Sequence, residues 1–179
     1  DAPMFNLHLT GGSSQASGAR MLLMSTSGAI YNNIRLGGAP GPGSLNTCLV
    51  VTGSNIVVYG LEVANCGTTG ADAMRLNAAL NFSWTGGVMD ECPAGNCLSV
   101  ENGSTAYIQN VHFVTPTPTT GNAIKIDGTS TLSLLNSVVA GSAGAQGDGI
   151  DVAAGGILKL LNNKIDHDNA TGFTVNNAG

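Results

Sequence analysis

The sequence predicts an all-β solenoid of about seven coils, formed by a single domain over residues 1–179. Two observations carry this prediction. Asn or Gly recurs every 24 to 27 residues, each time after a short segment of alternating apolar residues. A second series of short polar residues recurs with nearly the same period. Repeats of this length that contain short strands are typical of solenoids. No amphipathic helical pattern is present, so no capping helix is predicted.

The segment 98–113, L-S-V-E-N-G-S-T-A-Y-I-Q-N-V-H-F, defines the repeat, with Asn110 as its anchor. Asn and Gly adopt left-handed backbone conformations at the lowest cost, so an anchor of this kind predicts a turn. The anchors form a turn ladder of Asn6, Asn33, Gly60, Gly86, Asn110, Asn136 and Asn162. The apolar side chains predicted to point inward in the coil of Asn110 are Leu98, Val100, Ala106, Ile108, Val111 and Phe113.

The same template predicts the other coils in order. A strand surrounds Asn6, and the following coil occupies 19–47 and ends in the loop G-G-A-P-G-P-G-S. Counting ten residues back from the anchors predicts that Leu23 and Val50 point inward. Phe82 and Trp84 are predicted inside the coil that begins at 72. The coil of 98–113 is followed by the loop T-P-T-P-T-T-G and then by coils that begin at 122 and 148.

Short polar residues lie four residues before the core position of the first strand in each coil. Their side chains bond neighbouring backbone at corners and stack from coil to coil. They predict a corner ladder of Asn46, Asp72, Asn96, Asn122 and Asp148.

The composition excludes several classes of protein. Charged residues make up 9% of the chain and the net charge is −5, without a basic cluster, which argues against a nucleic-acid partner. No apolar run is long enough to span a membrane, so no membrane partner is predicted.

Four cysteines favour an exported protein, and the Asp-Ala-Pro start predicts either a removed signal peptide or a piece of a longer chain. We therefore expect an extracellular location. Cys92 and Cys97 bracket C-P-A-G-N-C, and we predict that they form a disulfide. Cys66 and Cys92 are an alternative pair, and Cys48 is predicted to be a buried thiol.

These ladders and the three short strands per coil resemble the right-handed parallel β-helix of pectate lyases, polygalacturonases, phage tailspikes and many surface proteins. The resemblance covers almost the whole chain. It implies the fold and leaves the function open, because this fold carries enzymes, adhesins and structural proteins alike.

The motif G-D-G-I-D-V at 147–152 is similar to a polygalacturonase strand motif, in which aspartates act as acid and base. Its Asp148 already has a place in the corner ladder, and the other motifs of that family are absent. Arg75 and Lys125 are predicted to point outward in non-neighbouring coils without an Asp cluster beside them. His8 and His112 lie several coils apart, and the patch Asp166-His167-Asp168 reads as a solvated loop. We therefore predict no enzymatic activity, no catalytic residue, no metal site and no cofactor.

The two ends of the chain carry complementary parts of one coil. Val175 is predicted to occupy a first-strand position, and four residues to Gly179 plus six more reach Asn6 of another copy, which makes the ten residues found inside each coil. The prediction is a homopolymer that grows head to tail by strand complementation. Its interface residues are Ala2, Met4, Leu7, Leu9, Phe173, Val175 and Asn177. A glycan-binding tailspike or adhesin segment is the alternative, and a polysaccharide lyase or hydrolase is the third interpretation.

Overall fold

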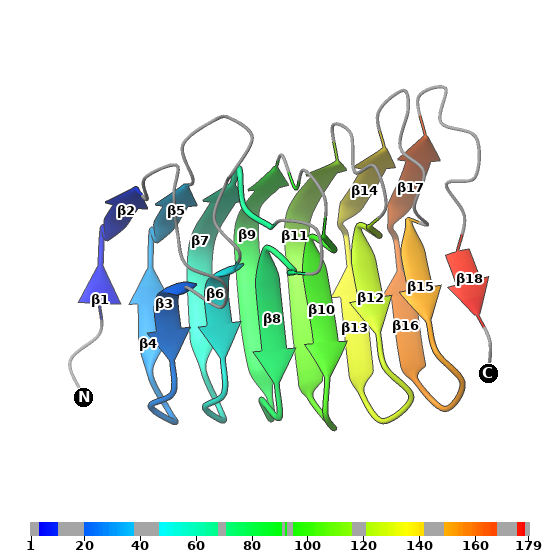
Figure 1. Cartoon of the computed structure of the whole chain (residues 1–179), viewed down its shortest axis with the longest axis horizontal. Helices are drawn as coiled ribbons and strands as arrows, with labels where there is room; N and C mark the ends of the chain where they lie inside the picture. The colour runs from blue at the N-terminus through cyan, green and yellow to red at the C-terminus, as the bar shows by residue number, and fades with distance from the viewer. Residues whose placement is uncertain are drawn as a thin grey trace.

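The computed structural model describes residues 4–10, 20–37, 47–67, 71–90, 92, 95–115, 121–141, 149–167 and 175–177. All regular secondary structure in this part of the chain is β-strand, and every strand pair within it is parallel. The strands stack side by side along one axis, from β1 at the N-terminal end to β18 at the C-terminal end (Figure 1). The predicted all-β parallel solenoid is therefore confirmed.

Two sheets form the walls. Sheet A has eleven strands, whose main path runs β1-β4-β7-β9-β11-β13-β16. These strands are β1 (Met4–Phe5), β4 (Ile30–Asn32), β7 (Val57–Ala64), β9 (Phe82–Asp90), β11 (Thr105–Thr115), β13 (Thr131–Leu135) and β16 (Ile157–Leu161). Its remaining strands are β2 (His8–Thr10), β5 (Arg35–Gly37), β14 (Val138–Gly141) and β17 (Lys164–His167).

Sheet B has seven strands in the order β18-β15-β12-β10-β8-β6-β3. They are β3 (Arg20–Met24), β6 (Thr47–Val51), β8 (Met74–Asn77), β10 (Leu98–Glu101), β12 (Ile124–Ile126), β15 (Ile150–Val152) and β18 (Val175–Asn177). The stack amounts to about five turns, fewer than the seven predicted. Seven rows stack in each sheet, but β1 with β2 at one end and β18 at the other belong to incomplete turns.

The anchor residues bend sheet A. All seven have positive φ angles, between 46° and 71°. In β7, β9 and β11 the anchors Gly60, Gly86 and Asn110 lie inside one long strand and divide it into two differently directed halves. The side-chain amide of Asn33 also donates a hydrogen bond to Oδ1 of Asn6 one row away, at 3.1 Å. Left-handed backbone at a fixed place in each row therefore forms one edge of the solenoid.

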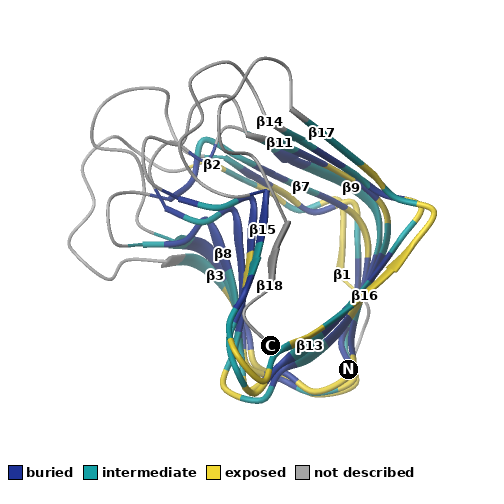
Figure 2. Ribbon diagram, turned by 90° about the vertical axis from the view of Figure 1, so that its right-hand side faces the viewer, coloured by how far each residue is buried: buried dark blue, intermediate teal, exposed yellow. Residues whose placement is uncertain are grey.

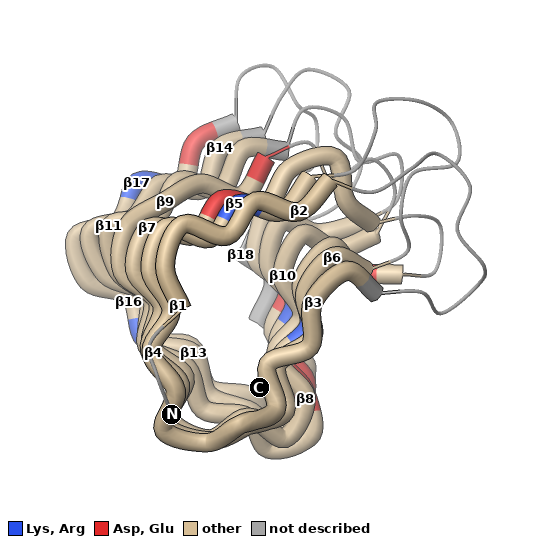
Figure 3. The backbone as a smooth tube through the Cα atoms, turned by 90° about the vertical axis from the view of Figure 1, so that its left-hand side faces the viewer, with Lys and Arg blue, Asp and Glu red and all other residues tan. Residues whose placement is uncertain are grey.

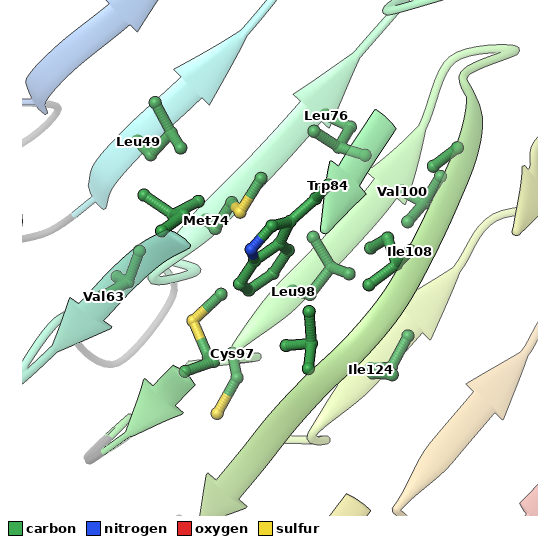
Figure 4. Close-up of a cluster of buried hydrophobic side chains, with 14 of the residues drawn as sticks. Leu49, Val63, Met74, Leu76, Trp84, Cys97, Leu98, Val100, Ile108 and Ile124 are labelled. Atoms are coloured by element: carbon green, nitrogen blue, oxygen red, sulfur yellow. The ribbon is translucent and has the colours of Figure 1, made fainter. Parts of the chain in front are cut away.

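The core fills the space between the walls. Trp84 and Phe113 pack edge to face with ring centroids 5.7 Å apart, and the indole N–H of Trp84 donates to the carbonyl of Gly86 at 2.9 Å. Side chains from both sheets meet around the indole (Figure 4). All six residues predicted to point inward in the coil of Asn110 are buried, while Tyr107 between them is exposed.

The register of the first two rows of sheet B differs from the prediction. Met24 and Val51 occupy the inward column of Leu76, whereas Leu23 is exposed and Val50 pairs with the outward-facing Arg75. The connection between the sheets is shorter here. Met24 to Tyr31 is seven residues, but the equivalent Leu76 to Trp84 is eight. A constant count of ten residues from the anchors therefore placed these strands one residue out of register.

Two disulfides close loops at the edge of the core. Cys92 pairs with Cys97, and Cys48 pairs with Cys66. The expectation of a buried thiol at Cys48 was therefore wrong, although Cys48 is fully buried. The two pairs are compatible with an extracellular protein.

Candidate functional site

Corner-ladder residues line the outer side of sheet B. Asn96 donates to Oδ1 of Asp72 through its side-chain amide at 2.6 Å and through its backbone N–H at 3.2 Å. The backbone N–H of Asn122 in turn donates to Oδ1 of Asn96 at 3.0 Å. Each polar side chain thus satisfies the backbone of the next row. Asn46 and Asp148, the other predicted members, lie outside the described residues.

A polar hollow of about 500 Å³ opens beside this ladder, across β8, β10 and β12. Besides the ladder amides, it is lined by the charged side chains of Asp72, Arg75, Glu101, Lys125 and Asp127. Arg75 and Lys125 lie in non-neighbouring rows, as predicted, with β10 between their strands. The expectation that no acidic cluster stands beside them was wrong, because Asp72, Glu101 and Asp127 line the same hollow. These carboxylates come from different rows and meet only when the rows stack.

Arg75 links two carboxylates in this hollow. One guanidinium nitrogen lies 3.2 Å from Oδ2 of Asp72. Its Nε lies 3.0 Å from Oε1 of Glu101, without the geometry of a hydrogen bond, so this contact is an ion pair only. Burial raises the pKa of Glu101 above its ordinary value, and the nearby Arg75 guanidinium only partly offsets this effect. Glu101 is thus protonated more easily than an ordinary glutamate.

Asp127 stabilises a turn at the rim of the hollow through hydrogen bonds. Its Oδ2 accepts the backbone N–H of Asn102, and its Oδ1 accepts both the N–H and the hydroxyl of Thr129 at 2.9 Å. Burial raises its pKa, but the hydrogen bonds from Asn102 and Thr129 outweigh burial and lower the pKa overall. This carboxylate therefore caps a turn and is held in its charged form.

The other chemically interesting residues are scattered. Asp151 faces outward next to Lys125 in the adjacent row and accepts the side-chain amide of Asn122 at 3.4 Å. His8 and His112 occupy the same outward column but lie four rows apart. Asp166 pairs with Lys164 at 2.5 Å, while the side chain of His167 and all of Asp168 lie outside the described residues. Within the described ranges, no three His, Cys, Asp or Glu side chains are grouped closely enough to hold a metal ion.

The two ends of the stack have complementary steps. At the N-terminal end, among the strands that the structure describes, sheet A extends one row beyond sheet B, because β1 pairs with β4 and the row of sheet B ends at β3. At the C-terminal end, sheet B extends one row beyond sheet A, because β18 pairs with β15. Figures 2 and 3 look onto the C-terminal and N-terminal ends respectively.

One column of inward apolar side chains is buried in the middle of the stack but exposed at both ends. Met4 and Leu160 belong to the inward column of Val58, Ile108 and Leu134. The three central residues are fully buried, whereas Met4 is 40% exposed and Leu160 is 44% exposed. Leu7 and Leu9, also predicted interface residues, are partly buried against the core.

The register of β18 corrects the junction count made from sequence. Val175 pairs with Ile150, and Asn177 is the residue that pairs with Val152. Two residues from Asn177 to Gly179 plus six to Asn6 make eight residues, instead of the predicted ten. The count was wrong because Val175 lies two positions earlier in its strand than predicted. Ala2 and Phe173, the remaining predicted interface residues, lie outside the described residues.

No protein-family model matches the chain, and no curated protein matches it. Among the described residues, no helix is long and apolar enough to cross a membrane.

Proposed function

We propose that the chain is a non-enzymatic, extracellular structural protein that polymerises head to tail into a filament. The observation that supports this most directly is the pair of complementary half-coil steps at the two ends of the stack. The extra strand is β18 of sheet B at the C-terminal end and β1 of sheet A at the N-terminal end. When the two ends meet, β18 of one copy fills the open position opposite β1 of the next copy. Two copies thus join through one shared coil, in which β18 of one copy and β1 of the next form opposite walls.

The strand columns define the register of this joint. In the joint, β16 pairs with β1 of the next copy, so that Leu160 lies opposite Met4 and Asn162 opposite Asn6. The turn ladder then continues from one copy to the next. On the other wall, β18 lies between β15 and β3 of the next copy, which puts Val175 opposite Leu22. The register of each pair follows from the columns inside one copy and requires no change of fold.

The energetics favour this joint. Unpaired strand edges are templates for further strands, and a contact between unlike ends generates an open fibre. The exposed apolar surface of Met4 and Leu160 becomes buried, at about 25 cal/mol per Å². Association costs several kcal/mol in lost translational and rotational freedom. The joint therefore also depends on backbone pairing of β16 with β1, of β17 with β2 and of β18 with β3 of the next copy.

Two capping variants test the proposal. Met4→Asp places a carboxylate in the apolar joint at one end, and Leu160→Asp does so at the other; both sites are exposed in the single copy. Each variant alone should sediment as a folded monomer, while the wild type forms filaments. A mixture of the two variants should give dimers, because each retains the end that the other lacks. A monomeric wild type at high concentration, or filaments from either variant alone, would contradict the proposal.

A second candidate function is glycan binding in the polar hollow on sheet B. Its charged and amide side chains support this function, because they offer hydrogen-bond donors and acceptors to the hydroxyl groups of a sugar. Lys125→Met should then weaken binding of the protein to polygalacturonate or dextran in affinity electrophoresis. Lys159→Met, which removes a lysine from sheet A, is the matched control. Equal mobility of wild type and Lys125→Met in both polymers would exclude this function.

A further inference from the structure

The outward face of the sheet A segments that precede the turn-ladder anchors is unusually apolar. Strand alternation turns Tyr107 outward between the buried Ala106 and Ile108, and the same columns contain outward residues from β1 to β16. Among the residues that the structure describes, six of the ten exposed large hydrophobic side chains lie at these positions, so the exposed apolar surface of this part of the chain is concentrated on one wall. They are Phe5, Ile30, Tyr59, Tyr107, Ile157 and Leu161.

This face is also nearly uncharged. In the described segments of β1, β4, β7, β9, β11, β13 and β16 that precede the anchors, the only charged outward side chain is Lys159, and the remaining positions hold Ser, Thr, Asn, Gln, aliphatic and aromatic residues. In Figure 3 this wall is tan apart from a blue segment at β16. The outer side of sheet B differs, because it carries Arg75, Lys125 and Asp151. A large neutral and apolar surface on a soluble protein marks an interaction site.

We propose that this face packs against the same face of a second copy, so that filaments associate laterally. The inference rests on the proposed head-to-tail filament. Across the joint Leu161 lies opposite Phe5 of the next copy, so the apolar stripe runs without interruption along the filament. A second filament offers the same row spacing, and a partner without that spacing would lose register after a few rows.

The face has a shape and a size that suit a repeated contact. Around Tyr107 it contains a shallow hollow of about 320 Å³, lined by Ser83, Thr105 and Ser133, which receives a protruding side chain of the opposite copy. If all seven rows were as long as the five-residue strand β13, the face would cover roughly 550 Å² per copy, and the shorter strands β1 and β4 make it smaller. This area is less than the roughly 800 Å² per partner of a stable pair. Single copies therefore stay apart, while many weak contacts along two filaments add up.

The test compares filament bundles of four proteins by electron microscopy. The double variant Tyr59→Lys, Tyr107→Lys should form single filaments of unchanged length, and Tyr59→Ser, Tyr107→Ser should reduce bundling at least several-fold. The control Leu23→Lys, Val50→Lys places the same charges on sheet B and should bundle like the wild type. Bundling of the wild type should increase with NaCl, because salt screens the net charge of −5 per copy.

The outcomes separate the two proposals. Wild-type filaments that remain single at every salt concentration, or that bundle equally in the sheet A variants, would contradict the lateral contact alone. An equal loss of bundling in the sheet B control would also contradict it. If the wild type forms no filaments, both the lateral contact and the head-to-tail joint are wrong.

Discussion

The side-chain amide of Asn96 donates to Oδ1 of Asp72 at 2.6 Å, and that oxygen also accepts the backbone N–H of Asn96. Asp72 is almost fully buried and also pairs with Arg75. Asp72→Ala leaves these donors without an acceptor, so we expect a loss of about 2–3 kcal/mol in the free energy of unfolding, measured in urea. Asp72→Asn retains one oxygen and should lose less; equal losses would show that the ladder bond contributes nothing.

Trp84 should be among the most sensitive core positions. Trp84→Ala removes the ring contact with Phe113 and the bond to the carbonyl of Gly86, and it opens a cavity between the sheets. We expect a loss of about 3–5 kcal/mol in the free energy of unfolding. Tyr107→Ala, which removes an exposed ring one row away, should cost less than about 1 kcal/mol. Similar losses for both variants would contradict the assignment of inside and outside.

Much of the fold could be predicted from the sequence because the anchors have a strict backbone requirement. Left-handed φ angles occur at all seven predicted anchors, from Asn6 to Asn162. The register of Leu23 and Val50 could not be predicted, because a turn shortened by one residue leaves no mark on composition. The pairing of Cys48 with Cys66 also depends on how a loop folds back, which spacing alone does not reveal.

Asp127 should make stability depend on pH in the acid range. Its pKa is lower in the folded protein than its ordinary value of 3.8, so the folded state binds the proton less tightly than the unfolded chain. Its contribution is therefore fully present above that value and is lost as the pH falls through the lower folded pKa. The difference in unfolding free energy between wild type and Asp127→Asn should shrink below pH 3.8; a constant difference would refute this role.

The two disulfides should contribute unequally. The chain-entropy estimate gives about 3 kcal/mol for closing the loop from Cys48 to Cys66 and about 2 kcal/mol for the shorter loop from Cys92 to Cys97. Replacing each pair with alanine and measuring urea unfolding checks this order. A greater loss from the Cys92–Cys97 pair would contradict loop closure as the main source of stabilisation.

The polar hollow was not predicted because its parts come from three rows. Asp72 lies 29 residues before Glu101, and Glu101 lies 24 residues before Lys125, so the three meet only when β8, β10 and β12 stack. The repeat predicts the row in which each residue lies, but it does not show that side chains of different rows line one hollow. The complementary end steps were anticipated from the count between Val175 and Asn6, although the strand register behind that count was wrong.

The axial rise per subunit tests the head-to-tail filament most directly. Each sheet contributes seven rows along its path in one copy, and rows are 4.7–4.9 Å apart, so helical reconstruction of the filament should give a rise of about 33–34 Å. Sheets A and B should both continue through every joint at the spacing found inside the copy. A rise that differs from this value by more than one row, or a wild-type protein that remains monomeric, would contradict the account.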